Sequence, residues 1–285
     1  MSSDLFTSVD GISLHWLDHP GGEPPIVLLH GLTANARIFD GLVAAGLAPR
    51  YRTIVPDLRG RGLSSQPATG YSMADHAADI LGLCDALGLS RVVFAGHSFG
   101  GLLAIWIAAK HPERVERLVV LDVAGPSIQT PEVYRLIAPS LERLGKTYPS
   151  WEEFLATMRA APSFHEWWDP AIEAYYRADV EDLPDGRVRV RTRPETIAEV
   201  AARGREVNWE SLLAGLQVPT LLVTSHGSYG GPGTSAIVPR EAAQATAETI
   251  PGCRWVEVPG NHATMLFGKG AQLSVSAIAE FVSGG

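Results

Sequence analysis

Short apolar runs, each bounded by turn residues, alternate along this chain with longer segments of helical pattern. The runs cover residues 26–29, 53–55, 92–95, 118–121, 220–223 and 254–258. The helical segments cover residues 73–87, 102–110, 240–249 and 272–282. Continuous apolar strands separated by helices are typical of a parallel sheet covered on both faces. We therefore predict an α/β fold with a mostly parallel, doubly wound sheet, in which residues 12–17 form a strand at one edge.

The alternation stops between about residues 125 and 216, where charges of both signs and many aromatic side chains replace the apolar runs. We predict a core domain made of residues 1–125 and 216–285, with residues 126–215 inserted as a mostly helical cap. Residues 187–191 alternate at strand period and predict an exposed strand. Some aromatic side chains of the cap should line a substrate cleft, although packing inside the cap is the commoner role for any one of them. The candidate substrate-binding residues are Trp151, Trp167, Trp168, Tyr175 and Tyr176.

One strand-to-helix junction carries the sequence Gly96-His97-Ser98-Phe99-Gly100. A serine between two glycines at such a junction indicates a nucleophile elbow, in which the tight turn leaves no room for side chains at the glycine positions. Ser98 would then hold unfavourable backbone angles, with its hydroxyl exposed above the sheet. The alternative is an ordinary glycine-flanked turn between a strand and a helix.

A serine hydroxyl needs an imidazole to take its proton, and position selects His262 among the nine histidines. His262 follows the last predicted strand, so its loop should open at the same sheet edge as Ser98. The turn at His30 and Gly31 follows the strand 26–29 and should aim the backbone N–H of Leu32 at the space above Ser98. Together with the N–H of Phe99, it would form an oxyanion hole. His30 itself is expected to brace its loop, and His97 to point away from the site.

With these motifs the chain resembles the α/β-hydrolase fold superfamily, in its serine esterase and lactonase branch. The resemblance covers residues 5–125 and 216–283, and it rests on four markers in the usual order. They are His30-Gly31, the segment 56–64 (Pro-Asp-Leu-Arg-Gly-Arg-Gly-Leu-Ser), the Ser98 motif and Gly260-Asn261-His262. The resemblance implies that Asp57 is structural and that no cofactor is needed.

The chain departs from this family at the acid that should orient His262. Most members carry it after the strand at 220–224, in a pattern similar to G-x-x-D-x-x-V-P. Anchored on Val238-Pro239, that position falls on Ser235, which cannot offset the charge of an imidazolium.

Asp122 ends the strand after the elbow helix and should open at the same sheet edge. Haloalkane dehalogenases and zearalenone-type lactone hydrolases resemble this arrangement, because they place the acid after that strand. We therefore predict that Asp122 completes a triad with Ser98 and His262. Two alternatives remain open: Asp122 only caps its strand, or the site is an incomplete dyad assisted by water or His226.

Composition and charge limit the classes of partner that the chain is expected to bind. The net charge of −8 argues against nucleic acid and anionic membranes, and no run of about 18 apolar residues predicts a membrane span. Cys84 and Cys253 are expected to be core residues, and no Cys/His spacing predicts a metal site. The N-terminus shows no secretion signal, which predicts a cytoplasmic protein. The expected partner is a small-molecule substrate, and no pattern predicts the oligomeric state.

These residues predict hydrolysis of an ester, lactone or thioester of a mostly apolar small molecule through an acyl-enzyme on Ser98. One alternative uses the same fold for C–C bond hydrolysis, perhydrolysis or cofactor-free oxygenation of an aromatic ring. The other is a ligand-binding receptor that keeps hydrolase residues and turns over slowly.

Overall fold

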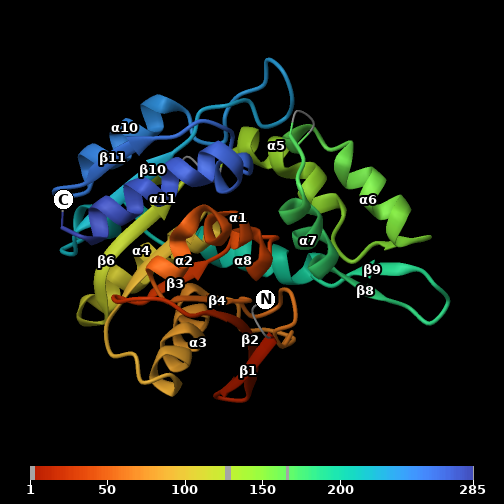
Figure 1. The fold of residues 1–285 in the computed structure, drawn as a ribbon, viewed down its shortest axis with the longest axis horizontal. Helices are drawn as coiled ribbons and strands as arrows, with labels where there is room; N and C mark the ends of the chain where they lie inside the picture. The colour runs from red at the N-terminus through yellow and green to blue at the C-terminus, as the bar shows by residue number, and fades with distance from the viewer. Residues whose placement is uncertain (1–3, 126–129, 165–166, 285) are drawn as a thin grey trace.

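A computed structural model describes residues 4–125, 130–164 and 167–284 of the chain (Figure 1). Its main sheet has eight strands in the order β1-β2-β4-β3-β5-β6-β10-β11. The strands are β1 Asp4–Val9, β2 Ile12–His19, β3 Ile26–Leu29, β4 Thr53–Pro56, β5 Val92–His97, β6 Val115–Leu121, β10 Thr220–Thr224 and β11 Arg254–Glu257. β1 and β2 pair antiparallel with each other, as do β2 and β4, while the remaining neighbours are parallel. The predicted α/β fold with a mostly parallel sheet is therefore confirmed.

Helices cover both faces of this sheet. They are α1 Asp40–Leu42, α2 Ala48–Arg50, α3 Met73–Ala86, α4 Phe99–Lys110, α10 Arg240–Thr249 and α11 Gly268–Val282. Helices α3 and α4 bury apolar side chains in one core, and α1 and α11 bury theirs in a second core. In β5 and β6, residues 92–95 and 118–121 contribute alternately to the two cores, which explains why both runs are continuously apolar.

Two helices begin earlier than the sequence predicts. α4 starts at Phe99 and α11 at Gly268, whereas helical patterns indicated residues 102 and 272. Glycines occupy both first turns, and glycine is a poor helix former. Close packing requires it here: a Cβ on Gly100 would lie 1.9 Å from the carbonyl oxygen of Leu29, and one on Gly270 would lie 2.7 Å from Met265 Cα.

The prediction of an edge strand at residues 12–17 is wrong in its placement. β2 lies inside the sheet between β1 and β4, and β1 forms the edge. β1 carries no continuous apolar run, because alternate residues face solvent; the Phe6 side chain, for example, is 57% exposed.

Between β6 and β10 the chain forms helices and a second, three-stranded sheet. The helices are α5 Pro131–Glu142, α6 Trp151–Arg159, α7 Pro170–Asp179, α8 Pro194–Gly204 and α9 Trp209–Ala214. The sheet has the order β7-β9-β8, with bounds Thr147–Tyr148, Val188–Val190 and Val180–Asp182. In Figure 1, α5, α6, α7 and the β8–β9 hairpin lie together on one side of the main sheet. The predicted strand at residues 187–191 corresponds to β9, whose two valines are buried while Arg189 between them is exposed.

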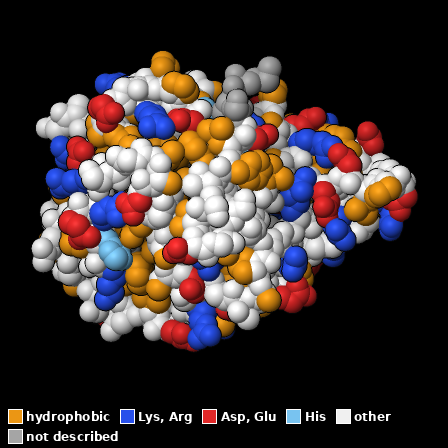
Figure 2. All heavy atoms as spheres, turned by 90° about the horizontal axis from the view of Figure 1, so that it is seen from below, with side chains coloured by type: hydrophobic (Ala, Val, Ile, Leu, Met, Phe, Trp, Pro, Cys, Tyr) orange, Lys and Arg blue, Asp and Glu red, His pale blue; other side chains and the backbone are white. Residues whose placement is uncertain are grey.

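Acidic and basic side chains are interspersed over the face shown in Figure 2, with apolar side chains between them. None of the helices in the described ranges combines the length and apolar character needed to cross a bilayer.

Candidate active site

Ser98 lies between β5 and α4 in a strained turn. Its φ is 55° and its ψ is −121°, a conformation that residues with a side chain rarely adopt. A Cβ on Gly96 would lie 2.1 Å from the carbonyl oxygen of Gly100, and one on Gly100 would lie 1.9 Å from that of Leu29. Neither glycine of the motif can therefore carry a side chain. The Ser98 N–H donates to the carbonyl of Leu121 at 3.0 Å, which ties the turn to the end of β6. This is the geometry of a nucleophile elbow.

Asp122 follows β6 directly and is fully buried. Its φ of 52° directs the chain out of the strand. One carboxylate oxygen lies 2.7 Å from His262 Nδ1, and the other accepts the N–H of Ser225 at 2.8 Å. The ring of His262 is thereby oriented, with Nδ1 occupied and Nε2 as the remaining nitrogen. The structure therefore brings together Asp122 and His262, which lie 140 residues apart in the sequence.

Residues near the family's usual acid position have other partners. The hydroxyl of Ser235 donates to Glu132 on α5 at 2.7 Å. His226 pairs through Nε2 with Glu257 at 2.8 Å, and its Nδ1 lies 3.0 Å from the carbonyl oxygen of Val238. Neither side chain orients His262.

Leu32 and Phe99 both line the cavity above Ser98. Phe99 is the first residue of α4, where backbone N–H groups have no partner within the helix and can bind an anion. His30 braces this region: its Nε2 accepts the N–H of Leu58 at 3.0 Å, and its Nδ1 donates to the carbonyl of Gly31 at 2.8 Å. Burial lowers the pKa of His30 to about 4, so the ring is neutral near pH 7.

Asp57 binds only groups of the structural framework. Its carboxylate accepts the N–H groups of Ala36 and Leu63 and lies 2.7 Å from Nδ1 of His15. These contacts fix the loop after β4, as the resemblance implied.

The prediction that His97 points away from the site is wrong. His97 lines the same cavity as Ser98, and its Nε2 donates to the backbone carbonyl of His262 at 2.7 Å. Gly31 leaves room for the ring, because a Cβ there would lie 3.4 Å from His97 Nδ1. Burial and the neighbouring His262 lower the pKa of His97 well below its usual value, so the ring is neutral.

A cavity of about 140 Å³ lies over Ser98 and His262. Besides apolar side chains from the main sheet's loops, it is lined by residues between β6 and β10 and by Tyr229 of the loop after β10.

The five candidate aromatic residues fall into two groups, those that line this cavity and those that do not. Tyr175 and Tyr176 line the cavity, whereas Trp168 stacks behind Tyr176 and Trp151 packs against Phe154. Trp167 lines a separate pocket. Sequence analysis missed Tyr229, which lies in a glycine-rich loop without helix or strand pattern.

Arg143 is the single Lys or Arg side chain among the described residues lining this cavity, and sequence analysis did not single it out. Its Nε donates to Asp179 at 2.9 Å, and both side chains are less than 5% exposed. The four remaining N–H groups meet the carbonyl and hydroxyl of Thr33, the carbonyl of Ser140 and the hydroxyl of Tyr175. Every N–H of Arg143 is thus engaged inside the protein.

In residues 4–125, 130–164 and 167–284, no three His, Cys, Asp or Glu side chains gather as a metal site would require.

Residues 24–269 match the protein family described as alpha/beta hydrolase fold. The chain belongs to this family. The matched region contains Ser98, Asp122 and His262, together with Leu32 and Phe99.

Among the relatives of this α/β-hydrolase is 2-(acetamidomethylene)succinate hydrolase of Mesorhizobium japonicum, 30% identical over 171 residues. That alignment covers 60% of this chain and 54% of the relative, so the chain spans about half the length of this curated protein. A crystal structure of E-2-(acetamidomethylene)succinate hydrolase superposes with a TM-score of 0.82 at 24% identity, covering 99% of this chain and 100% of the other. The enol-lactonase from Burkholderia xenovorans LB400 superposes with a TM-score of 0.70 at 22% identity, covering 98% and 100%. These two superpositions show a shared fold.

Proposed function

We propose that this α/β-hydrolase is a serine hydrolase that cleaves an ester, lactone or thioester bond of a small molecule. The observation that carries the proposal is the buried hydrogen bond of 2.7 Å between Asp122 and His262 Nδ1, beside a cavity that Ser98 also lines. This bond leaves Nε2 of His262 as the nitrogen that takes the Ser98 proton.

In the proposed reaction, Ser98 Oγ attacks the substrate carbonyl and His262 accepts its proton. The carbonyl electron pair moves to the oxygen, and the backbone N–H groups of Leu32 and Phe99 bind this oxyanion. When the C–O or C–S bond breaks, His262 protonates the leaving alcohol or thiol. His262 then takes a proton from water as the water oxygen attacks the acyl carbon, and it returns that proton to Ser98 Oγ when the bond between Oγ and the acyl carbon breaks and the acid is released. Asp122 stabilises the imidazolium that forms in both steps.

The substrate class follows from the cavity walls. Most of the described lining side chains are apolar or tyrosine, and the one arginine among them, Arg143, already has Asp179 as its counter-ion. An acyl group that enters this cavity should therefore be neutral and mostly apolar, since a buried carboxylate would find no free cation. We include in the proposal that residues 126–215 act as a cap, which supplies the Tyr175 and Tyr176 side of the cavity.

Fluorophosphonate labelling tests the nucleophile. The purified enzyme should incorporate one phosphonyl group on the Ser98 peptide, detected by mass spectrometry, and should hydrolyse p-nitrophenyl esters. Ser98→Ala should remain unlabelled. Labelling of another serine, or oxygen consumption with an aromatic substrate and no esterase activity, would contradict the proposal.

A matched pair of esters tests the substrate class. We expect kcat/KM for p-nitrophenyl butyrate to exceed that for the mono-p-nitrophenyl ester of succinate by about 100-fold, because burying an unpaired carboxylate costs several kcal/mol. Equal kcat/KM values for the two esters would contradict the proposed apolar acyl group. A higher value for the succinate ester would show a preference for carboxylates, and the relative named above acts, by its name, on a succinate.

A further inference from the structure

Arg61 is a fully buried arginine in the loop between β4 and α3. Its Nε donates to the carbonyl oxygen of Leu32 at 3.1 Å, and its Nη1 donates to the carbonyl of Arg59 at 2.6 Å and to Nε2 of His76 at 2.8 Å. Nη2 is buried and has no hydrogen-bond partner in the described part of the chain. The guanidinium also lies over the ring of Phe99, 5.2 Å from its centroid. Arg61 therefore contacts both residues whose N–H groups form the proposed oxyanion hole.

His76 holds Arg61 in place without neutralising it. Nδ1 of His76 donates to the carbonyl of Ser72 at 2.8 Å, at the start of α3, so Nε2 carries the lone pair that accepts from Arg61. Burial and the Arg61 charge lower the pKa of His76 well below its usual value, which keeps the ring neutral. The His76 ring also packs edge-on against Phe99, with centroids 5.3 Å apart.

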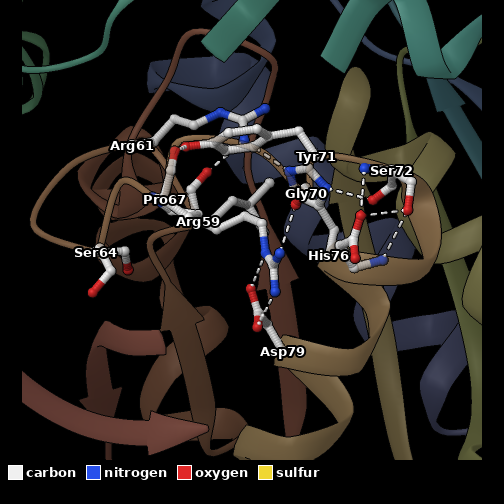
Figure 3. Close-up of polar contacts among 12 residues, drawn as sticks. Arg59, Arg61, Ser64, Pro67, Gly70, Tyr71, Ser72, His76 and Asp79 are labelled. Carbon is white, nitrogen blue, oxygen red and sulfur yellow. Dashed lines mark hydrogen bonds and ion pairs between the residues drawn. The ribbon is translucent and has the colours of Figure 1, made fainter. Parts of the chain in front are cut away.

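The charge of the neighbouring Arg59, unlike that of Arg61, is paired with a carboxylate. It forms a two-pronged ion pair with Asp79 at 2.5 and 2.6 Å and donates to the carbonyl of Gly70. In Figure 3 its side chain runs down toward Asp79, while the guanidinium of Arg61 lies in the upper part of the view, away from Asp79. Among the described residues no carboxylate lies within ion-pair distance of Arg61. Burial lowers the pKa of Arg61 to about 9, which still leaves the side chain charged at neutral pH.

We propose that Arg61 is a positioning residue of the oxyanion hole: it fixes Leu32 and Phe99, and its uncompensated charge stabilises the oxyanion that their N–H groups bind. The inference rests on the proposed function, because it takes Ser98 as the nucleophile. A fixed positive charge in a buried, water-excluded setting acts strongly on developing negative charge and needs no reorganisation during the reaction. An arginine that served only to stabilise the loop would be expected to have its buried charge paired with a carboxylate, as Arg59 has with Asp79.

The test uses an alkyl trifluoromethyl ketone. Ser98 Oγ adds to the ketone carbon, its proton passes to His262, and the carbonyl pair becomes an oxyanion in the Leu32–Phe99 hole. The corresponding secondary alcohol cannot be attacked and reports binding without an oxyanion. We expect Arg61→Gln to raise Ki for the ketone about tenfold and to lower kcat/KM for a p-nitrophenyl ester by a similar factor, with little change in KM or in alcohol binding. This effect is smaller than the 10²- to 10³-fold loss when an oxyanion donor itself is removed. Arg61→Lys keeps the charge and should recover part of both losses.

Arg59→Gln is the matched control, because it removes an arginine from the same loop whose charge is already paired. It should lower the free energy of unfolding while leaving Ki for the ketone within about twofold of wild type, since a paired charge contributes little field at the hole. Equal Ki values for wild type and Arg61→Gln, or equal increases in Arg61→Gln and Arg59→Gln, would overturn the inference. A wild-type enzyme that binds the ketone but hydrolyses no ester would refute the proposed function instead, since ketone addition still tests the oxyanion hole.

Discussion

Replacing Asp122 by asparagine is expected to lower ester turnover about 10⁴-fold while the protein stays folded, as the same change does in a serine protease triad. The side chain keeps its size, and asparagine tolerates the φ of 52° at this position. The Ser225 N–H can still donate to the amide oxygen at the site where it now meets the carboxylate. Turnover of a p-nitrophenyl ester and thermal unfolding of the same preparation measure the two expectations.

The loss follows from the direction in which the amide must point. With its oxygen held by Ser225, its NH₂ group faces Nδ1 of His262, where the second carboxylate oxygen lies now. Nδ1 must then accept a hydrogen bond, so the ring proton moves to Nε2. An imidazole protonated on Nε2 cannot accept the Ser98 proton.

Ser235→Ala provides the control for this prediction. Ser235 stands where most of the family carries the acid, but its hydroxyl binds Glu132 on α5. Its removal should leave turnover within about twofold of wild type, since it orients no catalytic group. Near-normal turnover in Asp122→Asn would exclude Asp122 as the orienting acid.

Asp179→Asn should destabilise the protein by about 3–5 kcal/mol, measured as the free energy of unfolding in denaturant. The carboxylate of Asp179 is the counter-ion of Arg143, and both side chains lie almost fully out of water. Removing one charge leaves the other buried without compensation, and the penalty of that desolvated charge accounts for most of the expected loss.

Two controls separate this penalty from a general effect of substitution. In the double variant Arg143→Met/Asp179→Leu no charge remains, so much of the lost free energy should return. Glu173 pairs with Arg159 on the surface, where the side chains are 40% and 52% exposed, and Glu173→Ala should cost less than about 1 kcal/mol. If Asp179→Asn and Glu173→Ala had similar small effects, the buried pair would not stabilise the fold as argued.

The main sheet was predictable because six of its strands contain a short, mostly apolar run and alternate with helices. β1 was not, since half of its side chains face water and its pairing with β2 depends on contacts that no local pattern reveals. The glycine-rich starts of α4 and α11 were hidden for another reason. Their glycines serve close packing against distant backbone, which local helix propensity cannot register.

Within the candidate site, the catalytic residues could be predicted because each of them follows the end of a strand. The ends of β5, β6 and β11 are close in a parallel sheet, so Ser98, Asp122 and His262 could be grouped from the sequence alone. The residues that line the cavity could not be predicted in the same way. Arg143 gains its role from Asp179 and Thr33, and the division between Tyr175 and Trp151 depends on which way each helix faces.

With the carboxylate on the end of β6, the stretch from Gly227 to Pro239 holds no part of the proposed proton relay. Insertions or deletions there can reshape the Tyr229 wall of the cavity without displacing Asp122, which is held at the end of β6 by the carbonyl of Val223 and the N–H of Ser225. Gly227 and Ser228 bind Gly260 and Asn261 in the loop that carries His262, and the Tyr229 ring packs edge-on against His262. Divergence among close homologues, and laboratory libraries aimed at new acyl groups, can therefore exploit residues 230–237 while turnover chemistry stays intact.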